Sequence, residues 1–269
     1  MLKRRQDYQP PVFLVISVFI TIDIKDDATD VTTKLAVRRN PDAVTDAPLW
    51  LDGQNIELTR LAIDSVELPV GHDMPDCVSL SDHGLSVAGL ADEAVVEVQS
   101  RCYPQDNTAL EGLYLSGGMY CTQCEPEGFR RIGYFPDRPD VMTVFTVRIE
   151  ASNAFPQILS NGNLVETGAV DADRHFAIWH DPHPKPSYLF AVVVGDLDCV
   201  TSPYVTASGR AVDLKIYVEK GNAKLTAHAM DSLIRSMRWD EQEYGLEYDL
   251  DLFQIVAVSH FNMGAMENK

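Results

Sequence analysis

The chain has 269 residues, of which 45% are hydrophobic, and this is enough for one large domain or two ordinary ones. Forty acidic side chains against 22 basic ones give a formal net charge of −18 at pH 7. A surface of this sign repels phosphate backbones and anionic headgroups, so nucleic acid and membranes are disfavoured as partners. It attracts cationic ligands, including protonated amino groups, although an acidic surface can also serve solubility alone.

The amino-terminal apolar run, residues 12–22, follows the basic patch Lys3-Arg4-Arg5 and could pass for the front of a signal peptide. No small-residue cleavage site follows it, and eleven residues are too few to span a bilayer. We therefore expect a strand there, with a targeting segment as the alternative. Five cysteines, an odd number, are scattered through the chain and favour a reducing, cytoplasmic compartment.

Short β-branched and aromatic runs separated by turn residues continue to about residue 200 and predict a sandwich or saddle of antiparallel sheets. The expected strands are 12–22, 31–38, 48–51, 56–68, 94–100, 141–150, 175–180 and 187–194.

The pattern changes after Gly195-Asp196, where we place a boundary between an amino-terminal β domain, 1–196, and a mixed domain, 197–269. Expected strands at 203–206 and 212–218 precede a helix over 222–244, which Gly245 closes. The expected apolar face of the helix consists of Leu225, Ala229, Leu233 and Met237, with Met230 and Ile234 beside them.

The last ten residues, 260–269, follow an apolar run, 252–258, that predicts a buried strand ending at a surface. Gly264 lets another backbone approach closely, Glu267 offers a carboxylate, and Met263 and Met266 offer apolar contacts. These residues suit the binding of an extended peptide by its amino end. They also fit a strand end with a turn glycine and a solvated glutamate.

A second dense stretch is Cys121-Thr122-Gln123-Cys124-Glu125-Pro126. A CxxC pair can bind zinc or cycle as a redox pair, but no further soft ligands lie nearby and the surroundings predict strands. We therefore expect two reduced cysteines packed beside a strand. Pro126 disfavours a helical conformation for Glu125, so this carboxylate is expected on an extended segment.

A catalytic metal site is not expected in this chain. None of the seven histidines begins a His-Glu-x-x-His motif. His180 and His183 lie among prolines that deny them a common helical face, and we expect both in a loop. The acidic residues of 240–251 lack the ligand spacing of an EF-hand, so we expect helix and loop surface there.

Several of these stretches together resemble the zinc aminopeptidases related to aminopeptidase N, in order and spacing. The likeness runs from about residue 30 to Lys269 and favours the bacterial alanyl aminopeptidases. The matching stretches are 107–114, 121–130, 137–141, 159–163, 181–186, 239–241 and the exopeptidase motif Gly264-Ala265-Met266-Glu267-Asn268.

The resemblance implies a metalloprotease that hydrolyses the first residue from peptides. Its fold would be a mainly β, saddle-like domain followed by the truncated start of a thermolysin-like α+β catalytic domain. Zinc would be the cofactor of the full-length enzyme, with none bound by this chain, and the partners would be peptides with a free amino terminus and the remainder of the catalytic domain. The substrate-binding residues by position would be Gln123, Glu125, Met263, Gly264, Ala265, Met266, Glu267 and Asn268.

In that family, Glu125 and Glu267 would together bind the α-amino group of the substrate. Gly264 and Ala265 would align the peptide as an added strand, and Met263 would line the pocket for the first side chain. Without the zinc motif, we expect the chain to lack peptidase activity. The alternative is a non-catalytic module that binds peptide ends or acts as a decoy.

Overall fold

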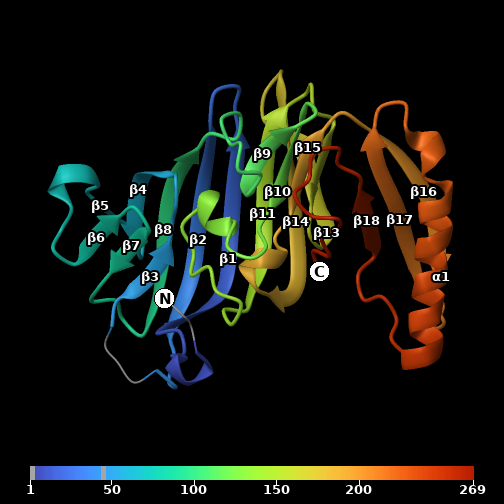
Figure 1. The fold of residues 1–269 in the computed structure, drawn as a ribbon. Coiled ribbons are helices and arrows are strands. Elements are labelled where there is room, and N and C mark those ends of the chain that lie inside the picture. The colour runs from blue at the N-terminus through green and yellow to red at the C-terminus, as the bar shows by residue number, and fades with distance from the viewer. Residues whose placement is uncertain (1–3, 44–46) are drawn as a thin grey trace.

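The large sheet forms the centre of the protein (Figure 1). The computed structural model describes residues 4–43 and 47–269, so Lys3 of the basic patch lies outside the described residues. Within these ranges the large sheet has eight strands. In sheet order they are β13 (Asn163–Ala169), β14 (Arg174–Lys185), β11 (Thr143–Ser152), β1 (Phe13–Ile24), β2 (Thr29–Arg39), β8 (Glu93–Cys102), β4 (Glu57–Ile63) and β5 (Val66–Leu68).

Three smaller sheets complete the described strands. The four-stranded sheet consists of β12 (Gln157–Ser160), β15 (Val192–Gly195), β10 (Met119–Gln123) and β9 (Gly112–Ser116). One three-stranded sheet consists of β3 (Leu49–Asp52), β7 (Gly84–Val87) and β6 (Val78–Ser81). The other, called the β16–β18 sheet below, consists of β16 (Leu197–Val205), β17 (Ala211–Glu219) and β18 (Leu252–Val256).

Helical structure is sparse. The described part of the chain has one α-helix, α1 (Ala227–Tyr244), which lies against the β16–β18 sheet (Figure 1). The short 3₁₀ turns are η1 (Arg5–Asp7), η2 (Gly71–Asp73), η3 (Phe129–Arg131), η4 (Ser187–Leu189) and η5 (Ala223–Leu225). No helix of the described residues is long and apolar enough to cross a membrane.

The predicted mainly β fold is confirmed, and most neighbouring strands pair antiparallel as expected. Two pairs of the described strands are parallel. At the centre of the large sheet β1 runs parallel to β11, with Ile20 opposite Val147, and in the β16–β18 sheet β17 runs parallel to β18. Side chains of β11 alternate between buried and half-buried, because alternate residues of a strand point to opposite faces of the sheet.

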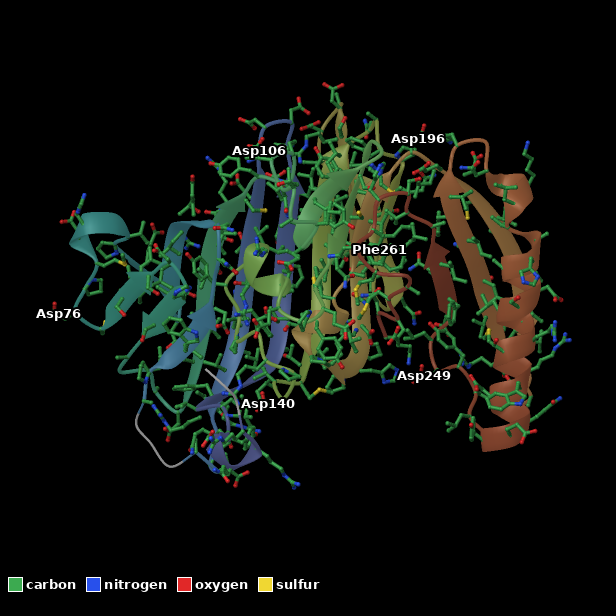
Figure 2. The ribbon with its side chains drawn as sticks, viewed as in Figure 1. Asp76, Asp106, Asp140, Asp196, Asp249 and Phe261 are labelled. Atoms are coloured by element: carbon green, nitrogen blue, oxygen red, sulfur yellow. The ribbon has the colours of Figure 1, made fainter. Side chains whose placement is uncertain are left out.

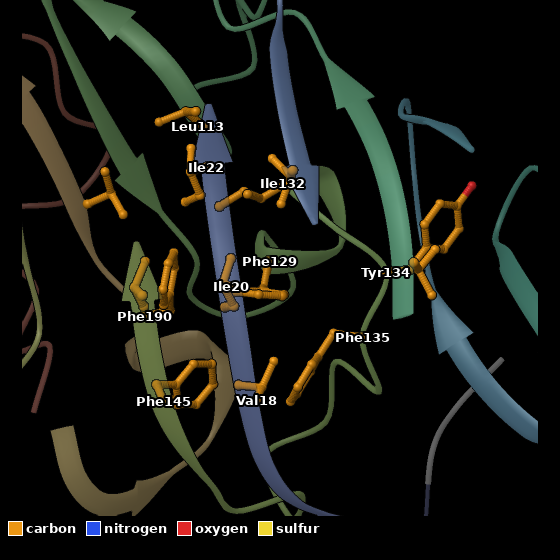
Figure 3. Close-up of a cluster of buried hydrophobic side chains, with 14 of the residues drawn as sticks. Val18, Ile20, Ile22, Leu113, Phe129, Ile132, Tyr134, Phe135, Phe145 and Phe190 are labelled. Atoms are coloured by element: carbon orange, nitrogen blue, oxygen red, sulfur yellow. The ribbon is translucent and has the colours of Figure 1, made fainter. Parts of the chain in front are cut away.

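The main core contains a cluster of phenylalanines together with apolar residues of β1 (Figure 3). Phe129 is fully buried, and its ring meets those of Phe135 and Phe190 edge-on, with centroids 5.2 and 5.1 Å apart. Edge-to-face packing is a favoured arrangement for aromatic rings. Because Phe190 directly precedes the Ala191–β15 segment, this cluster helps to hold the four-stranded sheet in place.

A second core lies between α1 and the β16–β18 sheet. Met230, Leu233 and Met237 of the helix are buried against β17, as their spacing predicts. Leu225 departs from the prediction. It belongs to η5 and is 70% exposed, because α1 begins only at Ala227. The residue between them, Thr226, donates its hydroxyl to the Ala223 carbonyl at 2.8 Å.

Other predicted elements have different bounds in the structure. The expected strand 56–68 is a hairpin of β4 and β5, because Asp64 and Ser65 both adopt positive φ and close a two-residue turn. In the expected strand 187–194, the first residues form η4, and β15 begins at Val192. Six strands were not predicted from the sequence: β6, β7, β9, β10, β12 and β13.

The prediction that His180 and His183 lie in a loop is wrong. Both belong to β14, which continues through Pro182 and Pro184 to Lys185. Beyond His180, β14 has left β13 and pairs only with β11, so one edge needs no backbone donor and prolines are tolerated. His180 Nδ1 lies 2.9 Å from the Thr146 hydroxyl.

Candidate functional site

The candidate site lies at one end of the four-stranded sheet. Gln123, the last residue of β10, pairs with Gly112, the first residue of β9. On its other side β10 pairs with β15, with Cys121 opposite Val193. The end of β10 and the starts of β9 and β15 therefore lie at the same end of this sheet.

Gln123 and Glu125 both lie at this end of the sheet, but the first is buried and the second is exposed. The Gln123 side chain is 1% exposed, its Nε2 donates to the Glu125 carbonyl at 3.3 Å, and its Oε1 is buried without a protein partner. A buried amide oxygen without a partner is costly, so Gln123 is an unusual residue for the interior of a strand end. Glu125 follows the strand and its side chain is exposed.

The predicted surface position of residues 260–269 agrees with the structure, because β18 ends at Val256 and most of the residues that follow are exposed. The segment turns back from the β16–β18 sheet toward the four-stranded and eight-stranded sheets (Figure 1). Phe261 lies near the middle of the molecule (Figure 2). The hydroxyls of Tyr114 and Ser116 in β9 each donate to the His260 carbonyl at 3.3 Å.

Residues 262–268 then cross the end of the four-stranded sheet. At one side, Asn262 Nδ2 donates to the carbonyl of Leu110, just before β9, at 2.9 Å. At the other side, Asn268 Nδ2 donates to the carbonyl of Leu189, just before β15, at 3.2 Å. Since β10 lies between β9 and β15, the segment passes the end of β10, where Gln123 and Glu125 lie.

The exopeptidase motif is accessible from solvent. Gly264, Ala265 and Glu267 are exposed, and Met263 is 45% exposed. An added Cβ on Gly264 would meet nothing within 4 Å, so the space above this backbone is open. Such a backbone offers free N–H and C=O groups that an extended peptide could pair with.

The two cysteines beside the site are free and buried, as predicted. Burial raises the pKa of the Cys121 thiol to about 11, and it raises the pKa of Cys124 well above its ordinary value. The thiolate is the form that attacks or binds a metal, so both groups are inert at neutral pH. Their role is to pack the strand that carries Gln123.

No three His, Cys, Asp or Glu side chains within residues 4–43 and 47–269 come together in a way that could hold a metal ion. The described residues therefore do not fit a zinc site by themselves.

Sequence reasoning missed the residues that contact the chain beyond β18, namely Tyr114 and Ser116, which bond to His260, and Asn161, which bonds to Asn268. Asn161 and Gly162 form the bend between β12 and β13. The asparagine side chain nevertheless also contacts Asn268, 107 residues away in the sequence. No local pattern signals such a contact.

The model of the Peptidase M1 N-terminal domain matches residues 20–189. The chain therefore belongs to the M1 peptidase family. Its resemblance to the amino-terminal portion of bacterial aminopeptidase N is confirmed by identities of 49% to aminopeptidase N of Caulobacter vibrioides and 44% to that of Escherichia coli. These alignments cover 98% and 99% of this chain and 30% of each relative, so the chain spans about a third of the length of these proteins.

Among solved structures, the chain is similar to Legionella pneumophila aminopeptidase A in complex with aspartic acid. The TM-score is 0.91 at 31% identity, over 97% of this chain and 30% of the other. The arrangement of sheets described above is thus shared with a peptidase of known structure.

Proposed function

We propose that this chain is the amino-terminal part of a zinc-dependent aminopeptidase and that it binds the amino end of the peptide substrate. The proposal is supported by the hydrogen bonds of Asn262 and Asn268, which tie the two ends of the segment that contains Glu267 to residues just before β9 and β15, the two neighbours of β10. We divide the chain into a β domain, 1–196, and part of a catalytic domain, 197–269.

The chemistry of an ammonium ion explains why two carboxylates are useful there. A free α-amino group has a pKa of about 8 and is mostly protonated at neutral pH. Carboxylates form short charge-assisted hydrogen bonds with it, whereas an internal peptide bond offers no cation. Glu125 and Glu267 would thus select chain ends. Gln123 would support this arrangement from beneath, because its buried Nε2 donates to the Glu125 carbonyl.

The remaining roles follow the position of each residue in the segment. Exposed backbone at Gly264 and Ala265 would pair with the substrate as an added strand, and Met263 would contact its first side chain. Met266 and Asn268 are half-buried and would support the segment from the protein side. Zinc would have to be held by residues other than the described ones, and we propose that the 269-residue chain is inactive alone. Its five free cysteines favour a cytoplasmic location.

Peptide binding tests this proposal directly. We expect trialanine with a free amino group to bind at least about tenfold more tightly than N-acetyl-trialanine in NMR titrations, because a hydrogen bond to a charged group contributes about 1.5–3 kcal/mol. Glu125→Gln and Glu267→Gln should each abolish most of this preference. Glu127→Gln, two residues from Glu125 and also exposed, is the matched control and should retain it.

Equal binding of the two peptides by the unaltered chain would refute the proposed function. Release of alanine from an alanyl reporter by the 269-residue chain, with zinc added, would refute the proposed inactivity.

A further inference from the structure

The turn between β12 and β13, residues 160–163, contacts the second part of the chain at three places. The Ser160 carbonyl accepts a hydrogen bond of 3.1 Å from Gln254 Nε2 in β18. Asn163 and Asp251 exchange two hydrogen bonds, each 3.1 Å long. Asn161, between these contacts, reaches the 262–268 segment itself. This turn therefore joins the sheets of the amino-terminal part of the chain to the residues beyond 250.

The side-chain amide of Asn161 both accepts and donates hydrogen bonds. Its Oδ1 accepts from the Ala191 backbone N–H at 2.7 Å, and its Nδ2 donates to the carbonyl of Leu189 at 3.0 Å and to that of Asn268. An amide nitrogen has two N–H groups, and each has an acceptor here. The orientation of the amide is fixed by these partners, since its oxygen faces a donor and its nitrogen faces two acceptors.

The contacts close into a ring, because Asn268 Nδ2 donates to the same Leu189 carbonyl as Asn161 does. Leu189 and Ala191 flank Phe190 and lead directly into β15, which pairs with β10. Asn268 is therefore linked to the approach to β15, and through it to the strand that carries Gln123, both by the Asn161 side chain and by its own side chain.

We infer that Asn161 is a positioning residue that holds the 262–268 segment, and with it Glu267, beside the end of β10. Its part in substrate binding rests on the proposed function above, whereas its hold on the segment does not. Asn161 itself need not touch the peptide. Asn161 is half-buried, and its side chain bonds to Leu189, Ala191 and Asn268.

Backbone ¹⁵N relaxation of residues 262–268 tests the hold on the segment. We expect order parameters near 0.85 in the unaltered chain and below about 0.6 in Asn161→Ala. Asn161→Asp keeps the acceptor for the Ala191 N–H and removes both donors, so it should release the segment equally. Asn153→Asp is the matched control, because Asn153 lies in another turn and its Nδ2 donates at 3.1 Å to the Ala172 carbonyl.

A segment that is already mobile in the unaltered chain, or that stays rigid in both Asn161 variants, would overturn the inference. Should these variants fail to fold, Asn161→Ser, whose shorter side chain cannot span from the Ala191 N–H to the Asn268 carbonyl, must give the same release. A rigid segment in that variant would count equally against it.

Peptide binding tests whether Asn161 acts through Glu267. Asn161→Ala should lower the preference for trialanine over N-acetyl-trialanine at least about fivefold at a temperature where the variant is folded. The same change made in a Glu267→Gln background should have no further effect on the preference. A purely structural role would lower the melting temperature and leave the preference of the folded variant intact, which would overturn the inference. If the unaltered chain shows no preference, the proposed function fails, and the relaxation measurement alone decides whether Asn161 positions the segment.

Discussion

Gln254 of β18 donates its side-chain Nε2–H to the backbone carbonyl of Ser160 in β12, over 3.1 Å. This bond joins two sheets that belong to different parts of the chain. Neither residue is fully exposed, so water does not readily replace the bond.

Gln254→Glu should weaken this junction. The substitution places an acceptor against an acceptor, and we expect the free energy of unfolding to fall by about 1–3 kcal/mol. Gln242→Glu makes the same chemical change on the exposed face of α1 and should alter stability by less than about 0.5 kcal/mol. Urea unfolding of both variants gives the comparison, and equal stabilities would contradict the assigned role of Gln254.

Phe129→Ala should be among the most destabilising core substitutions. The side chain is fully buried and meets two other phenylalanine rings at 5.1 and 5.2 Å, so its removal leaves a cavity. Truncation of a buried phenylalanine costs about 3–5 kcal/mol. Phe19→Ala in β1, where the ring is 40% exposed, should cost far less. Denaturant titration monitored by circular dichroism measures both, and similar losses would show that the phenylalanine cluster is not tightly packed.

Gly162→Ala should be costly for a reason that is independent of hydrogen bonding. Gly162 has φ +83°, and a Cβ there would lie 2.2 Å from the His180 carbonyl oxygen of β14. Gly118 has a similar φ, +88°, with nothing within 4 Å of the added Cβ. Gly118→Ala therefore carries only the left-handed backbone penalty, about 1–2 kcal/mol, and Gly162→Ala should exceed it by the cost of displacing β14. Thermal unfolding of the pair tests this, and equal losses would argue against the close approach.

The hold on the end of the 262–268 segment should depend on pH through Asp249. Burial acts against the charged form of this carboxyl, but a hydrogen bond from Lys269 and the nearby His183 outweigh it and hold the pKa of Asp249 below its ordinary value of 3.8. An acid with a depressed pKa stabilises the folded arrangement above its unfolded value, and this contribution is lost as the pH falls through the folded pKa. We expect the Lys269–Asp249 ion pair to persist at neutral pH and to break below about pH 3.8.

Titration of the Asp249 carboxyl by ¹³C NMR measures this pKa. Lys269→Ala should raise it toward 3.8, whereas Lys224→Ala, which removes a lysine from η5 instead, should leave it unchanged. A pKa of 3.8 or above in the unaltered chain would contradict the assigned ion pair.

The elements that could be predicted from the sequence are those whose pattern is local. The apolar run of β1 and the helical period of Met230, Leu233 and Met237 were sufficient to predict a strand and a packed helix. Strand β10 escaped prediction because all five of its residues are buried, so no alternation of apolar and polar residues marks it. The β4–β5 turn escaped because Asp64-Ser65 lacks the glycine typical of a two-residue hairpin turn.

The candidate site was predictable only in its parts. Glu125 and Glu267 were selected from motifs that match a family, and neither the composition nor the spacing of the residues indicates where the 262–268 segment lies relative to β10. That relationship arises from contacts made by Asn262 and Asn268 to residues 152 and 79 positions away. Contacts at such separations are set by tertiary packing, and a single sequence carries no periodic signal for them.

The parallel pairing of β1 with β11 affects how the protein is assembled during synthesis. As the chain leaves the ribosome, β1 can pair with β2 once residue 39 has emerged, but its other edge has no partner until residues 143–152 follow. Through that interval the central strand of the future sheet presents an apolar, unpaired edge, which is the kind of surface that chaperones cover and that aggregates share. Conditions that slow translation between those two points should therefore lower the yield of folded protein more than a delay placed after residue 152.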